Sequence, residues 1–347
     1  MNTTEQQGII TGFTPLKTHH CVTGSMRNIF EYYGYQILEE VLFGLGCGIG
    51  FGYLEIKGTI PFVGGRANVG RAGEDGLEIT AAKRTGVEVR RYTTSSVKKA
   101  ETRLLELIND KKPVMLYVDM GFLPYFNLPP ETHFGAHMVV IAGYDPNTSR
   151  VFVADRDGKL HPVSLSYLAQ ARNSKFKPFP PKNAWFEWDF SNAHEIKPDD
   201  VKRSIFETAD KMINPPISNL GCKGIYKAAQ RIKNWHQILD NNSLRAACFN
   251  GYIYIDATGG TGGGLFRYMY SRFLHEAVTY TGISRLEDIS IKFKNIGNRW
   301  QEVALAFKEA AESSNPPDFL KDIGTNILMI AEMEKAAWEQ LFDTMKR

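Results

Sequence analysis

The sequence contains few of the features that would assign it to a membrane or to a nucleic-acid complex. No apolar run approaches the roughly 20 residues that a membrane-spanning helix needs. The 347 residues carry a formal net charge of only +3, with no long basic block and no zinc-finger spacing. We therefore expect neither a membrane nor a nucleic acid among the partners.

Cysteine is scarce as well. The chain has four, which are widely scattered: Cys21, Cys47, Cys222 and Cys248. This spacing is not typical of a disulfide framework, so we expect free thiols. The polar stretch 1–14 lacks a basic segment followed by an apolar one, which argues against a secretory signal. Together these observations predict a cytoplasmic protein.

What the sequence does contain is enough apolar material, 43% of its residues, for a core in each of two domains. Up to about residue 192 an early helix precedes a cluster of strands, the order typical of an α+β domain. Expected strands cover residues 87–92, 114–118, 135–145, 151–155 and 185–188, and expected helices cover about 76–84, 95–109 and 165–172. A boundary near residues 191–198 follows. Beyond it we expect helices over about 199–213, 224–239, 265–280, 283–313 and 318–345, whereas residues 252–255 fit a strand or a buried helix segment.

The most informative residue is Cys21, which follows two histidines and opens a predicted amphipathic helix. The positive end of a helix dipole lowers the pKa of a cysteine at that place and favours the reactive thiolate. Far downstream, His137 stands near the start of one predicted strand and Asp155 at the end of the next. A hairpin between these strands would put the imidazole beside the carboxylate, which would fix its tautomer. Asp157 competes with Asp155, but it belongs to an Asp-Gly turn.

The order Cys, His, Asp on these elements predicts a papain-like thiol enzyme. We expect a papain-like catalytic domain at 1–195, in which a helix packs on an antiparallel sheet. A mainly α-helical domain at 196–347 would cover the active site. No metal site is expected, because the side chains of His19, His20 and Cys21 diverge. His133 and His137 would be about 13 Å apart on a strand.

Two glycine-rich segments are candidate binding loops. Residues 44–52 do not fit the dinucleotide pattern G-x-G-x-x-G, and we expect them to allow close backbone approach beside the active site. Residues 259–264 lead into a predicted helix that begins at Leu265, with Arg267 alongside. That segment fits either a phosphate site or a close packing turn, and both alternatives stay open.

Several segments resemble the butirosin biosynthesis protein H family. They are residues 20–28, the glycine run ending at Gly52, 64–66, 118–119, 123–125, 135–137 and 143–145, with 262–267 resembling the helical domain that often follows. The resemblance implies a papain-like fold and transfer of an acyl group from a carrier protein's phosphopantetheine thioester to an amine. It also implies that Cys21 is the nucleophile, His137 the base and Asp155 its orienting partner. Papain-like proteases usually have an oxyanion-donating glutamine about six residues before the cysteine, and here that position is Pro15.

The expected function is therefore amide formation through a Cys21 acyl-enzyme in natural-product biosynthesis of the nonribosomal or aminoglycoside type. No bound cofactor is expected, since 4'-phosphopantetheine arrives on an acyl or peptidyl carrier protein. The amine acceptor would be small, either an aminoglycoside or a diamine, and a homodimer is left open. The alternatives are a cysteine peptidase or amide hydrolase, and an inactive carrier-binding module.

The expected substrate-binding residues are His20, Asp119, Tyr125, Arg66 and Arg267. His20 would border the thiol, Asp119 would attract a cationic amine, and Arg267 would accompany a phosphate. Tyr125, with Phe122 and Phe126, would line the acyl channel. Core packing is the alternative for these aromatic rings, and a strand-end cap is the alternative for Asp119.

Overall fold

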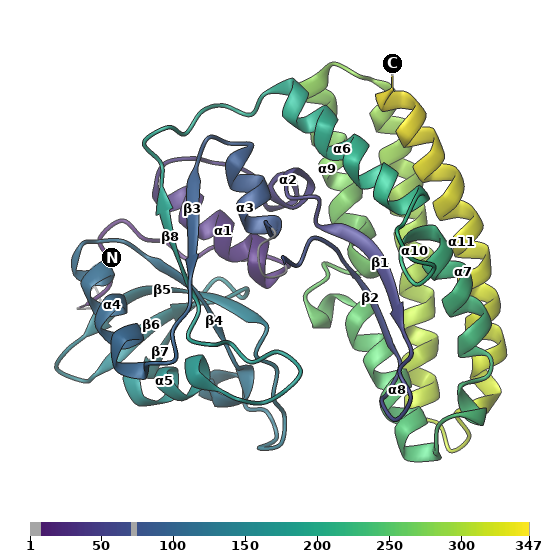
Figure 1. The fold of residues 1–347 in the computed structure, drawn as a ribbon, viewed down its shortest axis with the longest axis horizontal. Coiled ribbons are helices and arrows are strands. Elements are labelled where there is room, and N and C mark those ends of the chain that lie inside the picture. Colours follow the sequence, from purple (N-terminus) through teal and green to yellow (C-terminus); the bar gives the residue numbers. More distant parts are fainter. Residues whose placement is uncertain (1–7, 71–74, 347) are drawn as a thin grey trace, which may run out of the picture. The chain divides into compact units, whose positions relative to one another are not determined.

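The computed structural model describes residues 8–70 and 75–346, which fold into two compact units (Figure 1). The first unit contains the chain up to Leu42 and Gly86–Ala193. The second contains Phe43–Thr85 and the chain from His194 onward. Half of the polar N-terminal stretch, residues 1–7, lies outside the described residues. Within the described ranges, no helix is both long enough and apolar enough to cross a membrane.

The first unit is built on a six-stranded antiparallel sheet (Figure 1). In sheet order its strands are β3 (Glu88–Tyr92), β8 (Trp185–Asp189), β4 (Val114–Val118), β5 (His137–Asp145), β6 (Arg150–Ala154) and β7 (Leu160–Ser164). Five of these strands agree with the sequence prediction. Strand β7 was not predicted, because Pro162 interrupts its pattern; the strand tolerates this proline at the edge of the sheet.

Three helices pack against the central strands of this sheet. They are α1 (Cys21–Tyr32), α4 (Val97–Asn109) and α5 (Leu165–Asn173). Met26, Ile29 and Phe30 of α1 are fully buried at helical spacing, which explains why this helix docks on the sheet. The expected α+β class, with an early helix packed on an antiparallel sheet, is confirmed.

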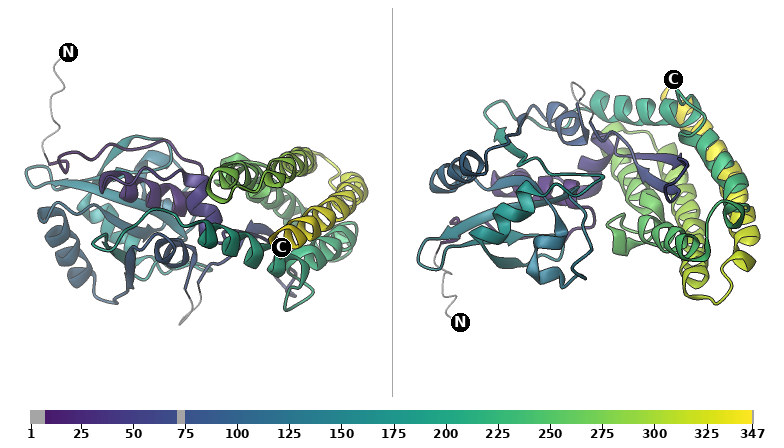
Figure 2. Two further views of the ribbon diagram at one scale, coloured as in Figure 1. Left: turned by 90° about the horizontal axis from the view of Figure 1, so that it is seen from above. Right: turned by 60° about the horizontal axis from the view of Figure 1, so that its bottom comes forward.

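The second unit is mainly helical. Its helices are α3 (Leu77–Lys83), α6 (Pro198–Ile213), α7 (Gly221–Ile232), α8 (Asn241–Ile255), α9 (Arg267–Thr281), α10 (Arg285–Glu312) and α11 (Pro317–Met345), and α2 (Glu39–Leu45) spans the division between the units. The long helices α10 and α11 lie side by side (Figure 1, Figure 2). Residues 252–255, for which a strand and a helix were both open, belong to helix α8.

The second unit also contains a hairpin of β1 (Ile49–Leu54) and β2 (Phe62–Arg66). Strand β1 contacts α7 and strand β2 contacts α8 (Figure 1). These contacts group residues 43–85 with the helices, whereas the sequence assigned them to a first domain at 1–195. Strand β1 was not predicted from the sequence, because its glycines have little strand propensity and supply no alternating side chains.

Candidate active site

Cys21 is the first residue of helix α1 and is half-buried. His20 precedes it in extended conformation as the N-cap, and the His20 ring accepts a hydrogen bond from the backbone N–H of Thr23. A ring nitrogen thus satisfies one of the free N–H groups of the first turn. Cys21 therefore lies at a helix N-terminus, as the sequence predicted.

His137 and Asp155 come together through the pairing of strands β5 and β6. His137 opens β5, and Asp155 follows β6 directly, so the antiparallel pairing brings both residues to the same end of the sheet. The distance from His137 Nε2 to Asp155 Oδ2 is 2.7 Å, and the two residues are 2% and 7% exposed. Asp157, the competing carboxylate, instead pairs with His161 at 3.0 Å.

The Cys21 thiol responds to this pair, because the His137 side chain and the Met138 backbone both favour its thiolate form and lower its pKa. Since Nε2 of His137 contacts Asp155, the ring nitrogen left for the thiol is Nδ1. Burial alone would raise the pKa of Cys21. The hydrogen bond and charge of His137, assisted by Arg156 and the Met138 backbone, lower that pKa overall.

The pKa values of His137 and Asp155 are shifted in opposite directions, and each shift favours the charged form of its group. Burial would lower the pKa of His137, but the neighbouring Asp155 and Cys21 raise it to about 9. Burial would raise the pKa of Asp155, but His137, Tyr125 and the Arg156 backbone hold it well below its usual range. A lowered thiol pKa and a raised imidazole pKa favour a thiolate–imidazolium pair at neutral pH.

Tyr125 has a contact that the sequence did not indicate. Its hydroxyl donates to Asp155 Oδ2 at 2.7 Å, and its ring stacks on His161 with centroids 4.0 Å apart. The Arg156 backbone N–H donates to the other oxygen, Asp155 Oδ1, at 2.7 Å. Asp155 thus contacts three groups: the His137 ring, the Tyr125 hydroxyl and the Arg156 backbone N–H. Only the tertiary fold brings these residues together.

The structure corrects the expectation for Asp119. This carboxylate is fully buried and accepts hydrogen bonds from four groups: the backbone N–H of Gly121, the backbone N–H of Phe134, the Ser174 hydroxyl and His133 Nδ1. With its oxygens occupied and no exposure to solvent, Asp119 has no free surface for a cationic amine. It caps the end of strand β4, which was the alternative interpretation.

The structure also corrects the expectation for Arg267. Its guanidinium is fully buried and forms an ion pair with Glu334 at 2.6 Å, while it also donates to the carbonyls of Gly50 and Leu265. The glycine-rich entry is a packing turn, because a Cβ on Gly264 would lie 2.7 Å from the backbone of Gly297. Arg267 is therefore unavailable to a phosphate.

Arg66 belongs to strand β2 in the second unit, where it donates to the carbonyl oxygens of Ala67 and Asn68. The triad residues all belong to the first unit. Nothing in these contacts gives Arg66 a role in binding substrate, so its assignment stays a prediction.

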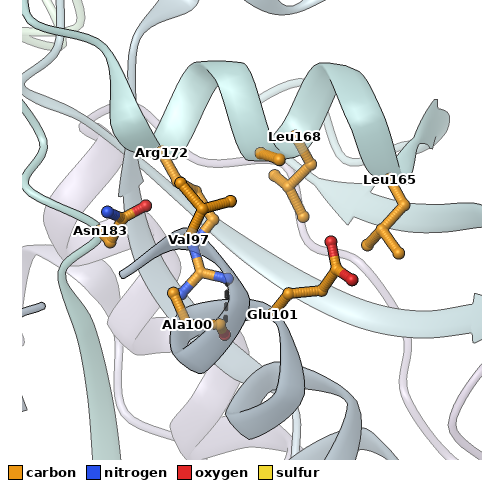
Figure 3. A pocket seen from close by; sticks show the side chains of 8 residues that line it. Val97, Ala100, Glu101, Leu165, Leu168, Arg172 and Asn183 are labelled. Atoms are coloured by element: carbon orange, nitrogen blue, oxygen red, sulfur yellow. Dashed lines mark hydrogen bonds between the residues drawn. The ribbon is translucent and has the colours of Figure 1, made fainter. Parts of the chain in front are cut away.

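A small cavity lies in the first unit between helices α4 and α5 (Figure 3). Arg172 and Asn183 line it, and Arg172 donates to the carbonyl oxygen of Ala100 at 3.0 Å. Its volume of about 10 Å³ has room for one water molecule at most. None of the triad residues lines this cavity, so it is not a substrate site for the triad.

Comparison with known protein families gives two matches. A model described as "Butirosin biosynthesis protein H, N-terminal" matches residues 20–156, a range that contains Cys21, His137 and Asp155. A model described as "Domain of unknown function (DUF4872)" matches residues 166–341. No curated protein matches the chain.

Proposed function

The chain belongs to the butirosin biosynthesis protein H family, whose name refers to the biosynthesis of an aminoglycoside antibiotic, and from this premise we propose that it is a cysteine-dependent N-acyltransferase. Its donor would be the phosphopantetheine thioester of an acyl or peptidyl carrier protein, and its acceptor a small amine. The protein itself would need no bound cofactor. The observation that supports the proposal best is the hydrogen bond between His137 and Asp155 at 2.7 Å, together with the lowered pKa that His137 gives the Cys21 thiol at the start of α1.

In the first half-reaction the Cys21 thiolate attacks the thioester carbonyl. A new carbon–sulfur bond to Cys21 forms, the bond to the pantetheine sulfur breaks, and the His137 imidazolium gives its proton to the departing thiolate. This proton is available at neutral pH, because the pKa of His137 is raised to about 9. Asp155 keeps the ring oriented by holding Nε2, which leaves Nδ1 to exchange the proton with the sulfur.

In the second half-reaction the amine attacks the acyl-enzyme. His137, now neutral, accepts a proton from the amine as the amide bond forms and Cys21 leaves as a thiolate. This restores the thiolate–imidazolium pair. No ATP is required, since the thioester and the acyl-enzyme have similar energies and the amide is lower.

The carbonyl oxygen becomes negative in both steps and needs donors. Pro15 occupies the place where papain-like proteases usually have glutamine, and a proline side chain cannot donate. We assign the backbone N–H of Cys21, at the positive end of α1, as one donor. The side chain of His20, which borders this end of the helix, is our candidate for the second.

The test is to incubate the enzyme with an acyl-loaded carrier protein and an amine, and to quantify amide and free acid by mass spectrometry. The proposal predicts amide that depends on both substrates and disappears in Cys21→Ala. Formation of free acid alone, unchanged by added amine, would identify a hydrolase instead. Turnover of a plain peptide without a carrier would identify a peptidase.

A further inference from the structure

A buried carboxylate that the sequence did not single out lies next to the nucleophile. Glu39 opens helix α2 and belongs, like Cys21, to the first unit. It is 1% exposed. It accepts the backbone N–H of His19 on Oε2 at 2.8 Å and the backbone N–H of His20 on Oε1 at 2.8 Å.

The same carboxylate also contacts the first turn of the helix that carries Cys21. The Thr23 hydroxyl donates to Glu39 Oε1 at 3.0 Å, and Thr23 Oγ1 lies 3.1 Å from Nδ1 of His20. Glu39 therefore holds the chain on both sides of Cys21: two residues immediately before it and one residue two positions after it. Thr23, His20 and Glu39 are buried, so the bonds among them are shielded from water, whereas His19 itself is exposed.

Burying a carboxylate is costly unless its lone pairs are satisfied. Burial raises the pKa of Glu39, and the hydrogen bonds from His20, His19 and Thr23 oppose that shift. Among the described residues no lysine or arginine forms an ion pair with Glu39, so its compensation consists chiefly of the three hydrogen bonds. A carboxylate with these bonds specifies one backbone geometry at the helix start, which an apolar side chain of similar size would not do.

We propose that Glu39 is a positioning residue that holds the Cys21 sulfur within reach of His137. This inference rests on the proposed function, because it assumes that Cys21 reacts as a thiolate. Consecutive Cα atoms are only about 3.8 Å apart, so movement of the His19–His20 backbone passes directly to Cys21. Without Glu39 the sulfur would lose part of its contact with the imidazolium that stabilises the thiolate.

The sign of the effect separates positioning from simple electrostatics. Replacing Glu39 by Gln removes a nearby negative charge, and that change alone would favour the thiolate and lower the pH at which Cys21 becomes reactive. Loss of positioning has the opposite effect, because it weakens the contact with His137. An upward shift is therefore expected only if Glu39 acts through geometry.

The experiment measures the rate of iodoacetamide modification at Cys21 between pH 4 and 10, with the site identified by peptide mass spectrometry. We expect E39Q to move the midpoint of this profile upward by about one pH unit, which is about a tenfold slower reaction at pH values below the wild-type midpoint. The control is E31Q, the same substitution in the last part of α1. Its profile should match the wild type within about twofold.

A folded E39Q protein whose midpoint is unchanged or lower overturns the inference. If circular dichroism shows that E39Q does not fold, the milder Thr23→Val variant removes one donor to Glu39 and should shift the midpoint in the same upward direction. An unshifted T23V would then overturn it. A wild-type Cys21 no more reactive than an ordinary thiol contradicts the proposed function itself, whereas a low wild-type midpoint with an unshifted variant contradicts only the role of Glu39.

Discussion

Replacing Asp155 by Asn tests the electrostatic basis of the site most sharply. The carboxylate contacts His137 Nε2 at 2.7 Å, and it is the main reason why the pKa of His137 rises from 6.5 to about 9. This pKa difference corresponds to a free energy of about 3 kcal/mol in favour of the imidazolium form of His137. Of the two neighbours that raise this pKa, Asp155 and Cys21, only Cys21 then still opposes the effect of burial, and we expect the pKa of His137 to fall to about 6.5 or lower.

The thiolate–imidazolium pair should then be lost over the interval from about pH 6.5 to pH 9. At pH 7.5 the protonated fraction of His137 would fall by about tenfold or more. We expect D155N to be modified by iodoacetamide at Cys21 about tenfold more slowly at this pH. The assay is the rate of Cys21 modification followed by peptide mass spectrometry across the same interval.

The matched control is D157N, which removes a neighbouring carboxylate that pairs with His161 instead of His137. Its rate at Cys21 should stay within about twofold of the wild type. A D155N protein that is folded and reacts at the wild-type rate with an unchanged pH profile would refute the assigned role of Asp155.

Three further predictions follow from the contacts described above. Tyr125→Phe removes one donor to Asp155 and should lower stability by about 1–2 kcal/mol, measured by urea denaturation; an increase in stability would contradict this contact. Glu334→Ala removes the ion-pair partner of the buried Arg267 and should lower the free energy of unfolding by about 3–5 kcal/mol, measured by thermal denaturation. Glu302→Ala, at an exposed ion pair, should lower it by less than about 1 kcal/mol. Because the pKa of His137 is raised, its own contribution to folding is fully present below pH 6.5 and is lost as the pH rises to about 9, whereas the lowered pKa of Cys21 contributes in the opposite sense over this range. We therefore expect the loss of stability in Cys21→Ala, measured by urea denaturation at each pH, and its absence in the Cys21→Ala/His137→Ala double variant.

The positions of Cys21, His137 and Asp155 in the fold could be predicted because each depends on local structure. Cys21 stands where an apolar helical pattern begins, and His137 and Asp155 belong to two strands that pair as neighbours. For the same reason the strongly apolar strand β4 was predicted with its full bounds. Patterns of this kind depend on residues that are close in sequence.

The rest depends on contacts between distant residues. Nothing near Glu39 in the sequence indicates that its side chain accepts hydrogen bonds from His19 and His20. Asp119 and Arg267 had plausible binding roles in the sequence, but the fold buries both among structural partners. Charge and local pattern cannot distinguish a buried ion pair from a ligand site, because burial is set by the whole fold.

Whether Cys21 carries the acyl group in transit can be measured by intact-protein mass spectrometry during a single turnover with an acyl-loaded carrier protein. We expect a mass increase equal to the acyl group, located on Cys21, absent in Cys21→Ala, and removed when the amine is added. Amide formation without any adduct on Cys21, or with undiminished rate in Cys21→Ala, would contradict this role of Cys21.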